Sequence, residues 1–167
     1  MYATLRFTLV LVLSNLALTP SWAEGDPAAL AAALKDTTAT LQGGLKASER
    51  EGTPISAKFE IENGKLQLSI YTMKDNNFME VVADPKTGAI GEAEKIKDAD
   101  DLKEAAAQKA AMANAKVPLL TATETAVKAN PGSQAVSIYP QLQNGQAVAE
   151  VTLLQGTVLK KVTEKLD

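Results

Sequence analysis

Residues 57–70 read Ala-Lys-Phe-Glu-Ile-Glu-Asn-Gly-Lys-Leu-Gln-Leu-Ser-Ile, and residues 138–151 read Ile-Tyr-Pro-Gln-Leu-Gln-Asn-Gly-Gln-Ala-Val-Ala-Glu-Val. Each stretch has an Asn-Gly pair at its centre and an apolar residue two places before the Asn. Because both central positions of a type I′ turn need positive φ, the pair predicts a two-residue β-hairpin in each stretch. The recurrence predicts that one small β unit is used twice in this chain.

The first Asn-Gly turn also predicts a strand register. With Asn63-Gly64 in the turn, every apolar residue meets an apolar partner, in the pairs Ile61–Leu66, Phe59–Leu68 and Ala57–Ile70. A slip of one residue would reverse every side chain, so the register is strongly specified. One face of this hairpin is therefore expected to be buried and the other solvated, the polar set being Lys58, Glu60, Gln67 and Ser69.

The second turn predicts the pairs Leu142–Ala147, Pro140–Ala149 and Ile138–Val151. Pro140 has no N–H to give to a ladder, which indicates that its strand is an edge strand or carries a bulge. Further strands are expected at residues 78–83, at 89–90 as a short fourth strand, and at 157–162. The charged stretch 91–101 is interpreted as a connection.

The helices are expected before the hairpins. Asp26 followed by Pro27 predicts a helix start, and an apolar stripe from Leu30 to Leu41 predicts one helix that ends or bends at Gly43-Gly44. An alanine-rich helix is expected at 102–116, broken near Pro118. Residues 121–124, Thr-Ala-Thr-Glu, have the capping-box spacing and predict the start of another helical segment.

Asp98, Asp100 and Asp101 precede the alanine-rich helix. We interpret them as N-capping residues placed at the positive end of the helix dipole. The alternative is calcium, because carboxylates are the oxygen ligands that this ion prefers. The glycine-containing twelve-residue calcium-loop spacing is absent, which favours capping.

The N-terminus indicates the compartment. Arg6 precedes the apolar run Phe7–Leu18, and small residues flank Trp22, which is typical of a secretory signal peptide at residues 1–23 cleaved after Ala23. A helix of this run would reach only about 18 Å, short of a hydrocarbon core of about 30 Å. We therefore expect a periplasmic or secreted protein without a membrane anchor after cleavage.

Composition narrows the classes of function. Loss of Arg6 leaves 16 basic against 20 acidic residues and a net charge of −4, which argues against a nucleic-acid surface. The chain has no Cys and no His, so thiolate chemistry, tetrahedral zinc sites and a Ser-His-Asp triad are excluded. No Lys–carboxylate constellation indicates an enzyme, and we predict no catalytic, cofactor-binding or metal-binding residue.

The order helix, strand, Asn-Gly, strand, turn, strand, Asp-Pro-Lys-Thr-Gly resembles the PepSY domain. That family typically has an Asp-x-x-Thr-Gly turn after its last long strand, and Asp84, Thr87 and Gly88 match it. The resemblance implies an α+β fold of two tandem PepSY-like units, each a helix packed on an antiparallel three- to four-stranded sheet. Residues 24–97 are the first unit, and residues 98–167 are the second, truncated at its last turn.

PepSY domains occur in the propeptides of thermolysin-like metallopeptidases and have been proposed to inhibit peptidases. The resemblance implies a non-catalytic protein-binding or peptidase-inhibitory module in the bacterial periplasm, with an envelope protein such as a peptidase as its partner. The candidate partner-binding face is Lys58, Glu60, Glu62, Gln67, Ser69 and Tyr71; the alternative is that it is only the solvated face of a sheet. A second hypothesis is a carrier that holds a small apolar ligand or peptide in a cleft between the units.

Overall fold

The computed structural model describes residues 26–167, so the predicted signal peptide and its cleavage site lie outside the described residues. The described chain forms four α-helices, one 3₁₀ helix and seven strands. In order they are α1 (Pro27–Leu34), α2 (Leu41–Ser48), η1 (Glu49–Glu51), β1 (Thr53–Glu62), β2 (Lys65–Lys74), β3 (Asn77–Ala83), β4 (Ile90–Lys95), α3 (Ala99–Met112), α4 (Leu119–Ala129), β5 (Gln134–Gln143), β6 (Gln146–Gln155) and β7 (Val158–Lys165).

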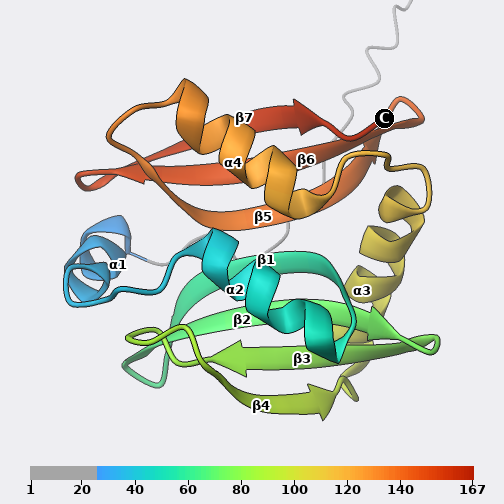
Figure 1. Ribbon diagram of the computed structural model, residues 1–167, viewed down its shortest axis with the longest axis horizontal. Coiled ribbons are helices and arrows are strands. Elements are labelled where there is room, and N and C mark those ends of the chain that lie inside the picture. The colour runs from blue at the N-terminus through green and yellow to red at the C-terminus, as the bar shows by residue number, and fades with distance from the viewer. Residues whose placement is uncertain (1–25) are drawn as a thin grey trace, which may run out of the picture.

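All seven strands belong to one antiparallel sheet with the order β4-β3-β2-β1-β5-β6-β7. Helices α2 and α4 lie side by side across one face of it (Figure 1). This face carries the main core, in which Leu41 and Leu45 of α2 are buried together with Leu68 and Ile70 of β2. Helix α3 packs on the opposite face, where Ser56 of β1 donates a hydrogen bond to its Gln108.

Both predicted hairpin registers are confirmed. Strand β1 pairs with β2 through Ala57–Ile70, Phe59–Leu68 and Ile61–Leu66, and β5 pairs with β6 through Ile138–Val151, Pro140–Ala149 and Leu142–Ala147. The first residue of each turn, Asn63 or Asn144, has φ near 50°, as a type I′ turn requires.

Of the two alternatives for the strand of Pro140, the bulge is confirmed and the edge position is wrong. Strand β5 is central, and its bulge lies between Ala135 and Ser137. Pro140 is tolerated because it lies beyond the short stretch in which β5 pairs with β1. In the alternating antiparallel pattern set by the Asn144-Gly145 turn, its missing N–H faces that unpaired side.

The single helix expected before the first hairpin is two helices. The chain leaves α1 after Leu34, and Thr40 starts α2 by accepting a hydrogen bond at its Oγ1 from the N–H of Gly43, at 3.0 Å. Gly43-Gly44 therefore lies inside α2 and does not end a helix. Gly44 is needed for packing, because a Cβ there would lie 2.6 Å from Cδ2 of Leu68.

Three other boundaries also differ from the expectation. Strand β4 is longer than predicted and includes the first part of the charged stretch. It is an edge strand of the sheet, where charged side chains are common. Helix α3 ends at Met112, and α4 begins at Leu119 directly after Pro118. The predicted capping box at 121–124 is wrong because Thr121 is already inside α4, where its carbonyl accepts from Thr125 Oγ1.

The strands recur at a constant spacing. Strands β5, β6 and β7 each begin 81 residues after β1, β2 and β3. Both first strands carry a bulge at the equivalent place, between Pro54 and Ser56 and between Ala135 and Ser137. The two halves of the sheet, β4 to β1 and β5 to β7, are thus built from hairpins with matching geometry.

The halves meet at one seam, between β1 and β5. Each of these strands has 10 residues, but the described structure pairs them only at Ala57–Ile138 and Lys58–Ser137. On either side of these pairs the two strands are not paired in the described structure, and a cavity lies between the end of β1 and the start of β5. Helix α3 packs on β5 and β1 at this seam.

Candidate functional site

The six residues of the candidate partner-binding face lie together on the face of β1 and β2 opposite α2. Lys58 forms an ion pair with Glu60, Ser69 Oγ donates to Glu60 Oε1 at 3.0 Å, and Gln67 Nε2 donates to Ser69 Oγ at 2.8 Å. The alternation of two adjacent strands brings these groups together, because Lys58 is the cross-strand neighbour of Ser69 and Glu60 that of Gln67.

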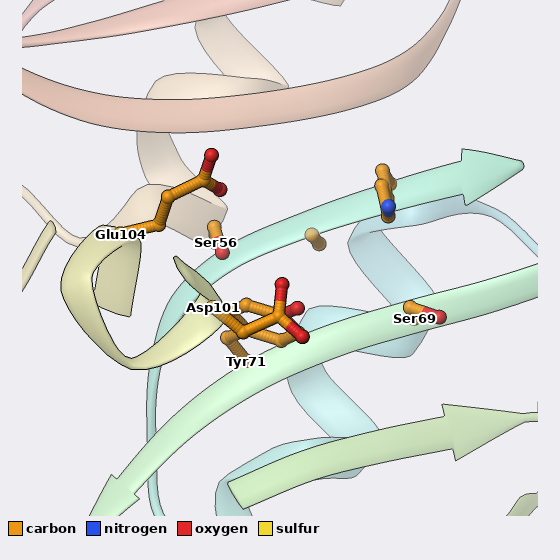
Figure 2. Close-up of a pocket in the computed structure, with 7 residues that line it drawn as sticks. Ser56, Ser69, Tyr71, Asp101 and Glu104 are labelled. Atoms are coloured by element: carbon orange, nitrogen blue, oxygen red, sulfur yellow. The ribbon is translucent and has the colours of Figure 1, made fainter. Parts of the chain in front are cut away.

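This face is less solvated than its pattern predicts. Ser69 is 2% exposed, since Glu60 and Gln67 reach across to its hydroxyl, and Glu62 is the one member of the six that is classed as exposed. Tyr71 lies apart from the network, next to Asp101 of α3 (Figure 2). The expectation of one buried and one wet face is therefore wrong where α3 lies.

A cavity of about 80 Å³ separates α3 from the sheet. Glu104 and Asp101 reach it from α3, Ser56 from β1, and Tyr71 and Ser69 from β2 (Figure 2). This volume suits a few water molecules and is too small for a metabolite. The polar groups that line it make it a structural pocket under the helix.

Most charged residues around this pocket are acidic. Burial raises the pKa of Glu80, with the nearby carboxylates Glu60 and Asp101 adding to the rise and Ser69 and Lys58 opposing it. Burial also raises the pKa of Tyr71 and that of Tyr139, and neighbouring carboxylates add to both. Both tyrosines therefore stay neutral near pH 7 and act as hydrogen-bonding groups.

The Asp84–Gly88 segment is a closed turn. Asp84 Oδ1 accepts from the N–H of Lys86 at 3.0 Å, from the N–H of Thr87 at 2.8 Å and from Thr87 Oγ1 at 2.9 Å. Gly88 supplies φ of 74°. The carbonyl of Lys86 accepts from Thr38, which ties the turn to the α1–α2 connection. The sequence interpretation of this motif as a turn is confirmed.

The carboxylates before α3 are also structural. Asp98 is the N-cap, and its Oδ1 accepts from the N–H of Asp100 at 2.9 Å and from that of Asp101 at 3.2 Å. Capping is thus confirmed. Within residues 26–167, no group of three or more acidic side chains is arranged to hold a metal ion.

A larger cavity, of about 390 Å³, lies at the opening between the end of β1 and the start of β5. Apolar side chains form most of its wall: Leu30 of α1, Phe59 and Ile61 of β1, Val136 of β5 and Leu159 of β7. Ser137, Tyr139 and Thr152 add polar groups. Its volume is in the range of ligand-binding pockets.

Sequence reasoning missed several residues at these cavities. Tyr139 was within reach, because it lies 81 residues after Lys58 and so belongs to the same polar face of the repeated hairpin. Asp101 and Glu104 had no comparable signal, since only the tertiary placement of α3 brings them to Tyr71. The opening at the seam likewise depends on how two distant strands meet.

Comparison with known proteins confirms the resemblance over the N-terminal half. Residues 28–94, from α1 into β4, match the PepSY family model, which is described as "Peptidase propeptide and YPEB domain". This stretch is therefore similar to the PepSY family, and the Asp84–Gly88 turn lies within it.

A search of solved structures found a chain of a proposed lipoprotein from Clostridium difficile 630. It is 16% identical, with a TM-score of 0.34 over 72% of this chain and 88% of that one. No curated protein matches. Along residues 26–167 we find no helix with the length and apolar character needed to span a membrane.

Proposed function

We propose that this chain is an exported, non-catalytic PepSY protein that binds a peptidase or another envelope protein and inhibits or regulates it. The match of residues 28–94 to a domain described by its occurrence in peptidase propeptides carries the proposal. A propeptide acts by contact with its peptidase, so the relevant chemistry is protein binding. Cleavage after Ala23 would place the protein in the periplasm or outside the cell.

The proposal includes two PepSY-like units, residues 24–97 and 98–167. The constant spacing of 81 residues, the equivalent bulges and the matching hairpin registers support a duplication. At this spacing Leu166 corresponds to Pro85 of the Asp84–Gly88 turn. The two units would share one sheet through the β1–β5 seam.

The face that carries Lys58, Glu60, Glu62 and Gln67 is the proposed contact surface. It is ordered before binding by the Lys58–Glu60 ion pair and the hydrogen bonds through Ser69, so little side-chain entropy would be lost on contact. Its carboxylates favour a partner surface with Lys or Arg.

The test is inhibition and co-purification with peptidases of the thermolysin-like class and of the cell envelope. The wild-type protein should slow such a peptidase, and Glu62→Lys should weaken this effect. Glu124→Lys is the matched control, because it makes the same charge change at an exposed position of α4, on the other side of the sheet. If the wild type neither binds nor slows any of these peptidases, the inhibitory function is refuted.

The carrier function remains a second candidate because the cavity at the seam is largely apolar and has the volume of a ligand site. A small apolar molecule or peptide that co-purifies in native mass spectrometry would support it. Purified protein without any bound molecule would count against it.

A further inference from the structure

Strand β7 is one of the two outer strands of the sheet, and it is the more regular of the two (Figure 1). It pairs with β6 in eight consecutive residue pairs without a register shift, and no strand lies on its other side within residues 26–167. The opposite outer strand, β4, has six residues and a register shift in its pairing with β3. Because short strands and bulges are the usual protection of a sheet edge, β7 is the edge better suited to pair with a further strand.

The turn between β6 and β7 determines which backbone groups of β7 point outward. Gln155 and Val158 flank this two-residue turn and pair with each other, so they form a hydrogen-bonded pair. Leu166 is in the same alternation as Val158, and its N–H donates to Ala147 of β6 at 2.9 Å. The outward N–H and C=O groups are therefore those of the alternate residues Leu159, Lys161, Thr163 and Lys165.

This alternation restricts how a second copy of β7 can pair with the edge. An antiparallel ladder must place an outward residue opposite an outward residue, so a two-fold symmetric ladder is centred on one residue of the strand. A centre at Lys160, Lys161 or Glu164 places that charged residue opposite its own copy. A centre at Thr163 places two lysines opposite each other. Of the five positions 160–164, only Val162 gives a centre without such like-charge pairs.

The register centred on Val162 is complementary in charge. Lys160 lies opposite Glu164 of the partner subunit, and by symmetry this pair occurs twice. Val162, which is half-buried against the main core, meets its own copy. Opposite charges and apolar side chains that face each other directly both stabilise an antiparallel pair of strands.

The side chains of β7 are available for these contacts. Glu164 takes part in none of the ion pairs found among residues 26–167. Lys160 Nζ donates to Asn130 Oδ1 at 2.7 Å, and an ammonium group has three donors, so it can keep this bond and also reach a carboxylate. Lys161 forms its ion pair with Glu150 of the neighbouring strand, at 2.8 Å, and needs no partner across the edge.

The helices leave room for a second sheet beside β7. Helix α4 packs on β5, β6 and β7, so its centre lies near β6. Two copies of α4 would then be about three strand spacings apart, or about 14 Å, which exceeds the about 8–10 Å between helices in contact. Helix α3 packs at the seam, farther from this edge.

We propose that the outer edge of β7 is a self-association site, at which two copies of this chain join in an antiparallel ladder centred on Val162. The two seven-stranded sheets then form one continuous sheet. The lysines of β7 oppose the other registers, so they select this pairing. Because the contact is two-fold symmetric, association stops at the dimer. The proposed contact face for a peptidase lies on β1 and β2 and stays accessible, so this inference goes beyond that function.

The first test is sedimentation velocity of residues 24–167. The ladder takes seven residues from each copy, far fewer than the about 20–30 of a standard interface, so we expect a dimer that dissociates on dilution, with a Kd on the order of 10–100 μM. A protein that stays monomeric at about 1 mM, ten times the upper value, overturns the proposal.

Charge reversal tests the register. Lys160→Glu and Glu164→Lys each place like charges opposite each other at two symmetric sites, and each should weaken self-association at least about tenfold. An equal mixture of the two variants restores every Lys–Glu pair and should form a heterodimer, and the double variant should dimerise as the wild type does. Single variants that dimerise normally, or a mixture that stays monomeric, overturn the register.

Lys74→Glu and Glu124→Lys are the matched controls. They make the same charge changes at exposed positions of β2 and α4, away from the edge, and should dimerise as the wild type does. A peptidase inhibited equally by the wild type and by Lys160→Glu shows that the protein-binding function does not depend on this dimer.

A second measurement uses the wild type alone. Hydrogen exchange at the outward N–H groups of Leu159, Lys161 and Thr163 should slow as the protein concentration rises through the Kd, because these groups become donors in the new ladder. The inward N–H groups of Lys160 and Val162 already bond to β6 and should change less. Concentration-dependent protection that leaves β7 unchanged and appears on another strand refutes the site.

Discussion

At the residue scale, Gly44 sets how closely α2 approaches the sheet. A Cβ at this position would lie 2.6 Å from Cδ2 of Leu68, which is itself fully buried, so neither side has room to move. Glycine lowers the intrinsic stability of the helix at this position. It also allows direct contact between the helix backbone and Leu68.

We predict that Gly44→Ala lowers the free energy of unfolding by about 1–3 kcal/mol, the usual effect of overpacking. Chemical denaturation measures it. Gly91→Ala is the control, because the nearest atom to its added Cβ is the Val82 carbonyl oxygen at 3.7 Å, an ordinary contact. A Gly44→Ala protein as stable as the wild type would show that α2 lies farther from the sheet.

Asp84 gives a pH-dependent prediction. Hydrogen bonds from the N–H and hydroxyl of Thr87 hold the pKa of Asp84 below its ordinary value. The contribution of ionised Asp84 to the free energy of unfolding is therefore complete above the unfolded pKa of about 4. It is lost as the pH falls through the lower pKa of the folded state. Asp84→Asn should melt below the wild type at pH 7, and the difference should shrink in acid. A difference that stays constant with pH contradicts this role.

Glu80 affects stability with the opposite dependence on pH. Burial raises its pKa in the folded state, so the ionised form opposes folding at neutral pH and the wild type gains stability as pH falls through the raised folded pKa toward the unfolded value. Glu80→Gln should therefore raise the melting temperature at pH 7 and have no such advantage at acid pH. Glu62→Gln, at an exposed position of the same face, should change little.

At the element scale, the start of α3 depends on its cap. Asp98 satisfies two of the N–H groups that a helix start leaves free. We predict that Asp98→Ala lowers stability by about 1 kcal/mol, whereas Asp36→Ala, which removes an exposed carboxylate elsewhere, has little effect.

Melting of the wild-type protein with and without a chelator should give equal midpoints. A lower midpoint with chelator would favour calcium at Asp98, Asp100 and Asp101.

The elements show which parts of the fold were predictable from sequence. Both hairpin registers follow from an Asn-Gly turn and alternating side chains, which are local features. The division of the first helix at residues 35–40 was missed because the apolar stripe continues through Leu41 into α2. The place of α3 over Tyr71 has no local signal, and neither has the cavity at the seam, because both depend on contacts between distant segments.

At the scale of the whole molecule, the β1–β5 seam joins the two halves of the sheet by two residue pairs in the described structure. Opening the seam breaks only these two pairs, so it exposes the amide groups of Ala57 and Ile138 to solvent. Exposing an amide group within either half of the sheet requires a more extensive unfolding. We predict that hydrogen exchange is faster at Ala57 and Ile138 than at Ile70 and Val151. Equal protection would show that α2, α4 and the shared core make the sheet open as one unit.

The same seam has a consequence for how the chain reaches its fold. Every other ladder of the sheet joins strands that are neighbours in sequence, so those ladders close short loops, whereas β1 and β5 must meet across about 80 residues. Both hairpins can form before the seam closes. The last step of folding would then be the joining of two preformed sheets, and a chain arrested there would expose the backbone of β1 to another molecule.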